Sequence, residues 1–208
     1  MASDDNDRPQ IYLITPTDPD ADSFGPVLEQ VLDAVPVACL RLRTASYDEA
    51  LVSRTADRFR GIAHERDVPL VIDAHAQLVT RLGLDGVHLA DGAKSVRKAR
   101  EALGAEAIVG AFCGTSRHDG MNAGEAGADY VAFGPAGDTP LGSGAKAEAE
   151  MFAWWSEMIE LPVVAEGALS AEAIAALAPV TDFFGIGDEI WGAEDPAVAL
   201  RSLMAQIV

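Results

Sequence analysis

The sequence has few cysteines, few basic residues and no long apolar run, and each shortage excludes a class of protein. Its two cysteines, Cys39 and Cys113, are too few and too far apart for a disulfide framework or a zinc cluster, which makes a reduced, cytoplasmic compartment the simplest expectation. The 15 lysines and arginines are outnumbered by 33 aspartates and glutamates, and the formal charge of -18 would repel a nucleic-acid backbone or an anionic membrane. No apolar run approaches the roughly 18 residues typical of a membrane span. Neither nucleic acid nor membrane is expected as a partner, although a small anion can bind where local cations and backbone N–H groups outweigh the overall charge.

The chain starts with an acidic, polar stretch, MASDDNDRPQ, that lacks the apolar core of a signal peptide. We expect residues 1–9 to be a disordered tail. Residues 10–208 are expected to form one domain, because a chain of 208 residues with 49% hydrophobic content can build one sizeable core and is short for two.

Short apolar, β-branched runs recur along the chain, and segments with apolar residues at helical spacing lie between them. The eight runs cover 11–15, 38–43, 69–73, 86–89, 107–112, 130–134, 162–166 and 182–187. Strands that are apolar throughout indicate a parallel sheet buried on both faces. A single closed (β/α)8 TIM barrel fits such regular repeats better than a doubly wound open sheet, because no G-x-G-x-x-G motif follows the first run.

The carboxyl ends of all strands in such a barrel share one rim, and that rim carries the active site. Polar residues and glycines at these ends are therefore the candidate site residues. They are Arg41, Arg43, Asp73, Asp91, Cys113, Asp138, Thr139, Glu166, Gly167, Gly187 and Asp188.

Arg41 and Arg43 alternate along one strand, so both face the same side and offer two guanidinium groups to the barrel mouth. A ligand is the favoured partner of these cations, because an unpaired guanidinium inside a barrel is costly. The alternative is a purely structural network in which the arginines pair with Asp73 or Glu166.

Glycines at 167, 185 and 187 lie at the ends of the last two strands, where barrels commonly bind a phosphate through backbone N–H groups. They are equally compatible with tight turns or close packing. Glu166 and Asp188 would bring negative charge to the same place, and a phosphate would have to avoid both.

The histidines divide into one expected core residue and two candidates for chemistry. His88 lies inside a strand and is expected to be buried. His75 and His118 lie just beyond strand ends, where an imidazole can act as an acid or base near neutral pH. Cys39 and Cys113 are more typical of small buried residues than of nucleophiles.

Four stretches resemble the thiamine phosphate synthase family and its relative, the thiazole tautomerase: IYLIT at 11–15, DGVHLAD at 85–91, GADYVAFGP at 127–135 and PVVAEGALS at 162–170. The resemblance covers most of the chain. It implies a (β/α)8 barrel that joins hydroxymethylpyrimidine diphosphate to a thiazole phosphate and releases pyrophosphate with the help of Mg2+. Small phosphorylated molecules would then be the ligands.

The family's ligand positions are only partly kept. Its Gln, Arg and Lys alternation falls on Cys39, Arg41 and Arg43, so that two cations remain. Its metal-binding aspartates fall on Ala74 and near Ala93. Asp73 and Asp91, the nearest acids to these two positions, are therefore expected either to be a relocated Mg2+ pair or to be remnants held by the arginines.

The resemblance also assigns residues to the substrates. Cys113 stands closest to the family's serine after the fifth strand. Thr139 begins the match to the family's Thr-Pro-Thr-Lys motif after the sixth strand. Lys146 corresponds to the lysine of that motif only if the chain has an insertion before it. The expected site therefore has Arg41, Arg43 and His118 as catalytic residues, Asp73 and Asp91 as metal ligands, and a substrate-binding set of Cys113, Thr139, Lys146, Glu166, Gly167, Gly187 and Asp188.

Three functions remain open from the sequence. The first is a thiamine phosphate synthase-like transferase. The second is a metal-independent, tautomerase-like enzyme with His118, His75 or Glu166 as the base. The third is a non-catalytic barrel that has lost the ancestral chemistry. A carboxylate at ~4 Å from a bound phosphate would repel it by about 4 kcal/mol in an effective dielectric of 20, which would weaken phosphate binding. The sequence does not indicate the oligomeric state.

Overall fold

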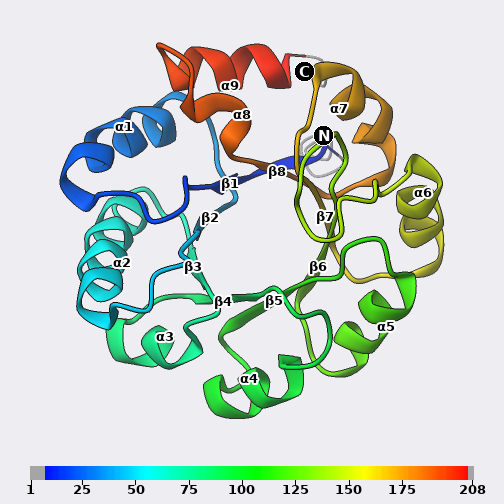
Figure 1. Cartoon of the computed structure of the whole chain (residues 1–208), viewed down its shortest axis with the longest axis horizontal. Coiled ribbons are helices and arrows are strands. Elements are labelled where there is room, and N and C mark those ends of the chain that lie inside the picture. Colours follow the sequence, from blue (N-terminus) through cyan, green and yellow to red (C-terminus); the bar gives the residue numbers. More distant parts are fainter. Residues whose placement is uncertain (1–7, 206–208) are drawn as a thin grey trace, which may run out of the picture.

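The computed structural model describes residues 8–205, which form a closed barrel of parallel strands inside a ring of helices (Figure 1). The strands are β1 (Gln10–Ile14), β2 (Cys39–Leu42), β3 (Leu70–Asp73), β4 (Gly86–Leu89), β5 (Ile108–Phe112), β6 (Tyr130–Phe133), β7 (Val163–Glu166) and β8 (Phe183–Ile186). The helices are α1 (Ala21–Ala34), α2 (Glu49–His64), α3 (Ala76–Leu82), α4 (Val96–Leu103), α5 (Arg117–Glu125), α6 (Ala149–Met158), α7 (Ala171–Leu177), the 3-10 turn η1 (Ala178–Val180), α8 (Asp188–Trp191) and α9 (Pro196–Met204). Of the expected tail, residues 1–7 lie outside the described residues.

The predicted TIM barrel is confirmed, and each predicted strand lies within one residue of its observed bounds. Every strand pairs in parallel with the next, and β8 closes the barrel by pairing with β1, where Ile11 lies opposite Phe184. Within residues 8–205, no helix is both long enough and apolar enough to cross a membrane.

Side chains alternate between the two faces of each strand, which separates an outer core from an inner one. Outward residues such as Leu40, Leu70 and Ile72 pack beneath the helices in the main apolar cluster. The inner cluster is smaller, and it consists of Tyr12, Ile14, Cys39, Val71, Phe112, Tyr130, Ala132 and Val164. Arg41 and Asp73 lie two residues after Cys39 and Val71 on β2 and β3, so they share the inner face and their side chains point inward.

A chain of polar groups crosses the inner core. His88 is 1% exposed, which confirms it as a core residue, and its Nδ1 lies 2.8 Å from the hydroxyl of Tyr130. That hydroxyl lies 2.5 Å from the hydroxyl of Tyr12. Burial lowers the pKa of His88 well below its usual value, and the positive charge of Arg41 lowers it further. The imidazole is therefore held in its neutral form.

Candidate active site at the barrel mouth

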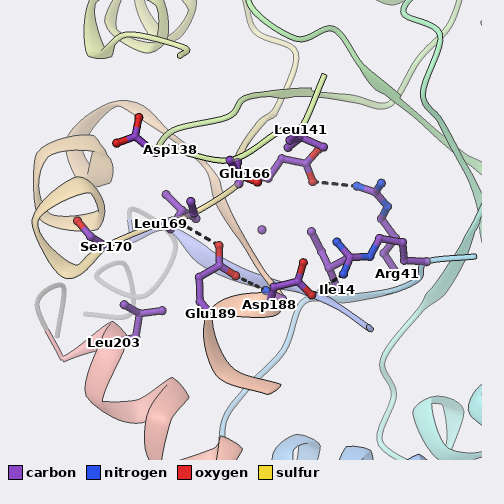
Figure 2. A pocket seen from close by; sticks show the side chains of 16 residues that line it. Ile14, Arg41, Asp138, Leu141, Glu166, Leu169, Ser170, Asp188, Glu189 and Leu203 are labelled. Atoms are coloured by element: carbon purple, nitrogen blue, oxygen red, sulfur yellow. Dashed lines mark hydrogen bonds and ion pairs between the residues drawn. The ribbon is translucent and has the colours of Figure 1, made fainter. Parts of the chain in front are cut away.

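Arg41 is the most heavily bonded cation at the mouth. Its Nε lies 2.6 Å from Oδ1 of Asp73, and its Nη2 lies 3.4 Å from Oδ2 of the same carboxylate. Its Nη1 donates to Oε2 of Glu166 at 2.8 Å. Because β1 and β8 lie between β2 and β7 in the barrel, this last bond crosses the interior (Figure 2). The structural network that was the alternative for Arg41 is thus present.

This cluster places two carboxylates around one guanidinium in a site with little solvent. Arg41 is 6% exposed and Glu166 is 3% exposed. Burial alone would lower the pKa of Arg41, but Glu166 and Asp73 raise it above its ordinary value, so the guanidinium stays charged. Burial raises the pKa of Glu166, and Arg41 opposes that rise. Oε1 of Glu166 has no hydrogen-bond partner within residues 8–205, which leaves one buried acceptor unsatisfied.

Arg43 also meets a carboxylate, but in a more open setting. Its Nη2 lies 2.5 Å from Oδ1 of Asp188, whose side chain is 72% exposed, against 27% for Arg43. Such exposed pairs are worth about 0–1 kcal/mol, so a ligand can displace Asp188 at little cost. Nε of Arg43 is buried and lacks a partner in the described part of the chain. Arg43 therefore keeps donors for a ligand, whereas Arg41 has its main donors engaged.

Glycines shape the ends of β7 and β8 for identifiable reasons. Gly167 has φ +91°, and a Cβ there would lie 2.8 Å from a methyl group of Leu141. At Gly185 a Cβ would lie 2.8 Å from Cβ of Glu166. The packing interpretation of these glycines therefore holds at both positions.

Glu189 occupies the backbone donors at the same two strand ends. Its Oε1 accepts from the N–H of Leu169 at 3.0 Å, and its Oε2 accepts from the N–H of Gly187 at 2.7 Å. Figure 2 shows the carboxylate lying between Leu169 and Asp188. Glu189 was not among the residues expected from the sequence, because nothing in G-D-E-I distinguishes it from an ordinary first-turn acid of a helix.

These residues border a pocket of about 550 Å³ at the carboxyl ends of β6, β7 and β8 (Figure 2). The pocket brings together seven of the twelve expected site residues, namely Arg41, Arg43, Thr139, Glu166, Gly167, Gly187 and Asp188. Its ionisable lining consists of two arginines against four acids, Asp138, Glu166, Asp188 and Glu189. The pocket wall is therefore negatively charged overall at neutral pH when these acids are ionised.

Asp91 and Cys113 line a different pocket of about 450 Å³ beside the ends of β4 and β5. Oδ2 of Asp91 accepts a hydrogen bond from Ser95 at 2.6 Å. Burial and the nearby Asp119 raise the pKa of Cys113 to about 12, so its thiol is protonated at neutral pH. The thiol fits a packing or contact role and not that of a nucleophile.

His118 and Lys146 line neither pocket. His118 is exposed on α5, with Nε2 3.1 Å from Nδ2 of Asn122. Lys146 pairs with Asp138 at 2.9 Å, and the side chain of Asp138 is 93% exposed. Like Arg41 and Arg43, Lys146 therefore forms an ion pair with a carboxylate of the chain.

The expected metal ligands have few free carboxylate oxygens to offer a metal ion. Both oxygens of Asp73 accept from Arg41, so this carboxylate is not free to be a ligand. Asp91 lies in the other pocket, where one of its oxygens is bonded to Ser95. No cluster of three or more histidine, cysteine, aspartate or glutamate residues suited to a metal occurs between residues 8 and 205. Asp73 and Asp91 together do not fit a magnesium site held by the protein.

Comparison with known proteins assigns the barrel to a family. The family model described as thiamine monophosphate synthase matches residues 11–182. A thiamine-phosphate synthase of Rhodospirillum centenum is 39% identical over 186 residues, which cover 88% of this chain and 89% of that protein. One of Erythrobacter litoralis is 36% identical over 204 residues and 95% of both chains. The chain belongs to the thiamine monophosphate synthase family.

Comparison with solved structures gives the same fold. A solved structure of thiamine phosphate pyrophosphorylase from Pyrococcus furiosus superposes with a TM-score of 0.82 at 21% identity, over 97% of this chain and 96% of that one. At this level of identity the likeness concerns the fold alone.

Proposed function

We propose that the chain catalyses the transfer that defines its family, in which a thiazole nitrogen displaces pyrophosphate from hydroxymethylpyrimidine diphosphate. The observation that carries the proposal is the pocket in which the guanidinium groups of Arg41, in β2, and Arg43, just after β2, face the ends of β6, β7 and β8. Family membership over residues 11–182 supports it. Both thiols are free and buried, which is compatible with the expected cytoplasmic location.

Arg43 is the residue assigned to the departing pyrophosphate. Negative charge grows on the leaving group during the reaction, and cations fixed beside it lower the barrier. Arg43 can exchange the exposed Asp188 for a diphosphate, and its buried Nε is an unused donor. Arg41 is assigned a positioning role, because a ligand that took its donors would leave the buried carboxylates of Asp73 and Glu166 unpaired.

Magnesium enters the proposal only together with the diphosphate. Mg2+ commonly binds one or two carboxylates along with substrate phosphates and waters. Asp91 lines a separate pocket beside β4 and not the pocket of Arg43, so the proposal assigns it no contact with this ion. No step of the proposed reaction is assigned to a metal held by Asp73.

The test is a measurement of pyrophosphate release from hydroxymethylpyrimidine diphosphate with Mg2+ and a mixture of thiazole phosphate and thiazole alcohol. Release that depends on thiazole supports the transfer. Arg43→Gln should raise KM for the diphosphate by about tenfold or more, which corresponds to the loss of one charge-assisted contact. Arg58→Gln, which removes an exposed arginine paired with Glu29, is the control and should leave KM unchanged. No thiazole-dependent release at high enzyme concentration would reject the proposal.

A second candidate, the non-catalytic barrel, is favoured by one specific observation. The expected cations Arg41, Arg43 and Lys146 each pair with an acid of the chain itself. A barrel of this kind would release no pyrophosphate, so the same assay separates the two candidates.

A further inference from the structure

We propose that Glu166 accepts a hydrogen bond from the amino group of the pyrimidine and so selects the aminopyrimidine diphosphate over its deaminated form. This inference rests on the proposed function, in which hydroxymethylpyrimidine diphosphate is a substrate. The ring of that substrate carries an amino group on the carbon beside the one that bears the methylene and the diphosphate. Glu166 is then the residue that sets the specificity of the pocket for the pyrimidine.

The first observation is the unpaired oxygen of Glu166. Its Oε2 accepts from Nη1 of Arg41 at 2.8 Å, whereas its Oε1 is buried and has no partner among the described residues. The residue is 3% exposed and lines the pocket. A buried acceptor without a partner is costly, and a donor on a ligand removes that cost. An amino group supplies such a donor.

The second observation is the space beside this carboxylate. Gly185 lies opposite Glu166 in the β7–β8 register, and a Cβ there would lie 2.8 Å from Cβ of Glu166. On the other side Gly134 follows β6, and a Cβ there would lie 3.4 Å from Cγ of Glu166. At these positions neither neighbouring strand places a side chain over Glu166. A flat ring can therefore approach the carboxylate with its edge.

The third observation is the rest of the wall around Glu166. Ile14 belongs to the inner apolar cluster, Leu141 packs against that cluster, and both line the pocket. Apolar side chains suit the faces of an aromatic ring, whereas its polar edge requires a directed partner. Burial raises the pKa of the Glu166 carboxyl, and the charges of Arg41 and Arg43 oppose that rise, so Arg43 lies within electrostatic reach. One ligand can thus place its diphosphate at Arg43 and its adjacent amino group at Glu166.

The deaminated ring makes the opposite match with this site. It carries a carbonyl oxygen in place of the amino group, so two acceptors would face each other at Oε1 of Glu166. A site built around an N–H donor discriminates against an analogue that lacks it, because a buried polar group of the protein is left unpaired. The hydrogen-bond direction at Glu166 therefore favours the aminopyrimidine.

The experiment measures the binding of three diphosphates by calorimetry, with Mg2+ and without a thiazole. They are hydroxymethylpyrimidine diphosphate, its deaminated oxo form, and an analogue with hydrogen in place of the amino group. We expect the wild-type protein to bind the first about tenfold or more tightly than either of the others. No transfer occurs without a thiazole, so the influence of the amino group on the reactivity of the ring does not enter the comparison.

Glu166→Gln is the variant that tests the unpaired oxygen. The amide keeps an oxygen for Arg41 and places its NH2 group where Oε1 was, so a donor replaces the acceptor. The ratio of the affinities for the amino and oxo forms should fall by about tenfold or more. Asp73→Asn is the matched control, because it also removes a charge beside Arg41, although both oxygens of Asp73 already accept from that arginine. It should change both affinities alike and leave their ratio unchanged.

The outcomes separate this inference from the proposed function. Equal or weaker binding of the amino form by the wild-type protein overturns the inference, and so does an absence of binding by all three diphosphates. A ratio that Glu166→Gln leaves unaltered, or that Asp73→Asn shifts equally, overturns it as well. These affinities do not depend on turnover, so they decide the inference even where no thiazole-dependent pyrophosphate release occurs and the transfer is rejected. Should Glu166→Gln fail to fold, the wild-type preference for the amino form over the hydrogen analogue decides alone.

Discussion

Arg41 shows how one side chain can stabilise the barrel while limiting its chemistry. It compensates the buried carboxylates of Asp73 and Glu166, and its donors are consumed in doing so. A single replacement of Arg41 therefore leaves two negative charges uncompensated in a site of low solvent access.

We expect Arg41→Met to lower the free energy of unfolding by about 3–5 kcal/mol, because breaking a buried ion pair strands its charged partners. Arg60→Met is the control, since it breaks a surface pair with Asp57 worth about 0–1 kcal/mol. Urea unfolding of the two variants and the wild type measures the difference. Adding Glu166→Met and Asp73→Asn to Arg41→Met should recover most of the loss. Equal costs for Arg41→Met and Arg60→Met would contradict the buried network.

His88 gives a pH dependence with a defined sign. The folded protein keeps the imidazole neutral by burial and by the charge of Arg41, which lower its pKa. The unfolded chain binds a proton there at about pH 6.5. The stability that depends on His88 is therefore fully present above that pH and is lost as the pH falls, until the folded pKa is reached.

Wild-type protein should consequently lose more stability on acidification than His88→Gln. From pH 7 to pH 5 the extra loss should be about 2 kcal/mol, close to 1.4 kcal/mol per pH unit below the unfolded pKa. Urea unfolding of both proteins at the two pH values measures this difference. Parallel pH profiles would show that the imidazole of His88 is free to take up a proton in the folded state.

At the scale of elements, β5 illustrates how the inner core constrains a strand. Gly110 lies opposite Tyr130 in the β5–β6 register. A Cβ at Gly110 would lie 1.9 Å from Cζ of Tyr130, so only glycine leaves room for the ring that bonds His88 and Tyr12. A glycine inside a predicted strand signals close approach of another group, but not which group.

Gly110→Ala should cost about 1–3 kcal/mol or more, because the added methyl group forces the ring of Tyr130 or the strand itself to move. Gly61→Ala on α2 is the matched control, since a Cβ there meets nothing within 4 Å. That replacement should gain about 0.5–1 kcal/mol, as alanine favours a helix interior over glycine. Thermal unfolding of both variants tests the pair. A Gly110→Ala protein as stable as wild type would contradict this packing of the inner core.

The elements themselves were predictable from the sequence. Continuous apolar runs give each strand to within one residue, because a parallel sheet buried on both faces admits few polar positions. The Asp-Pro pair at 195–196 marks the start of α9, where Asp195 accepts from the N–H of Val198. The short helix α8 was not predicted, because four residues are too few to show a helical period.

At the scale of the whole molecule, the barrel explains which site residues the sequence could predict. Closure brings the strand ends to one rim, so seven expected residues line one pocket although they come from four strands and their following loops. The partners of these residues were not predictable, because a strand pattern fixes the face of a side chain and not its contacts. Asp73 faces inward at the end of β3, whereas Asp91 lies two residues beyond β4 and bonds to Ser95. That difference is why two similar acids do not share a metal site.

The central claim is that Arg43 is available to take the diphosphate, whereas Arg41 is held by the buried carboxylates of Asp73 and Glu166. A crystal structure determined with hydroxymethylpyrimidine diphosphate present tests it most directly. The account predicts that the guanidinium of Arg43 leaves Asp188 for the diphosphate, and that Arg41 keeps its bonds to Asp73 and Glu166. A diphosphate bound to Arg41, with Arg43 still paired with Asp188, would contradict it.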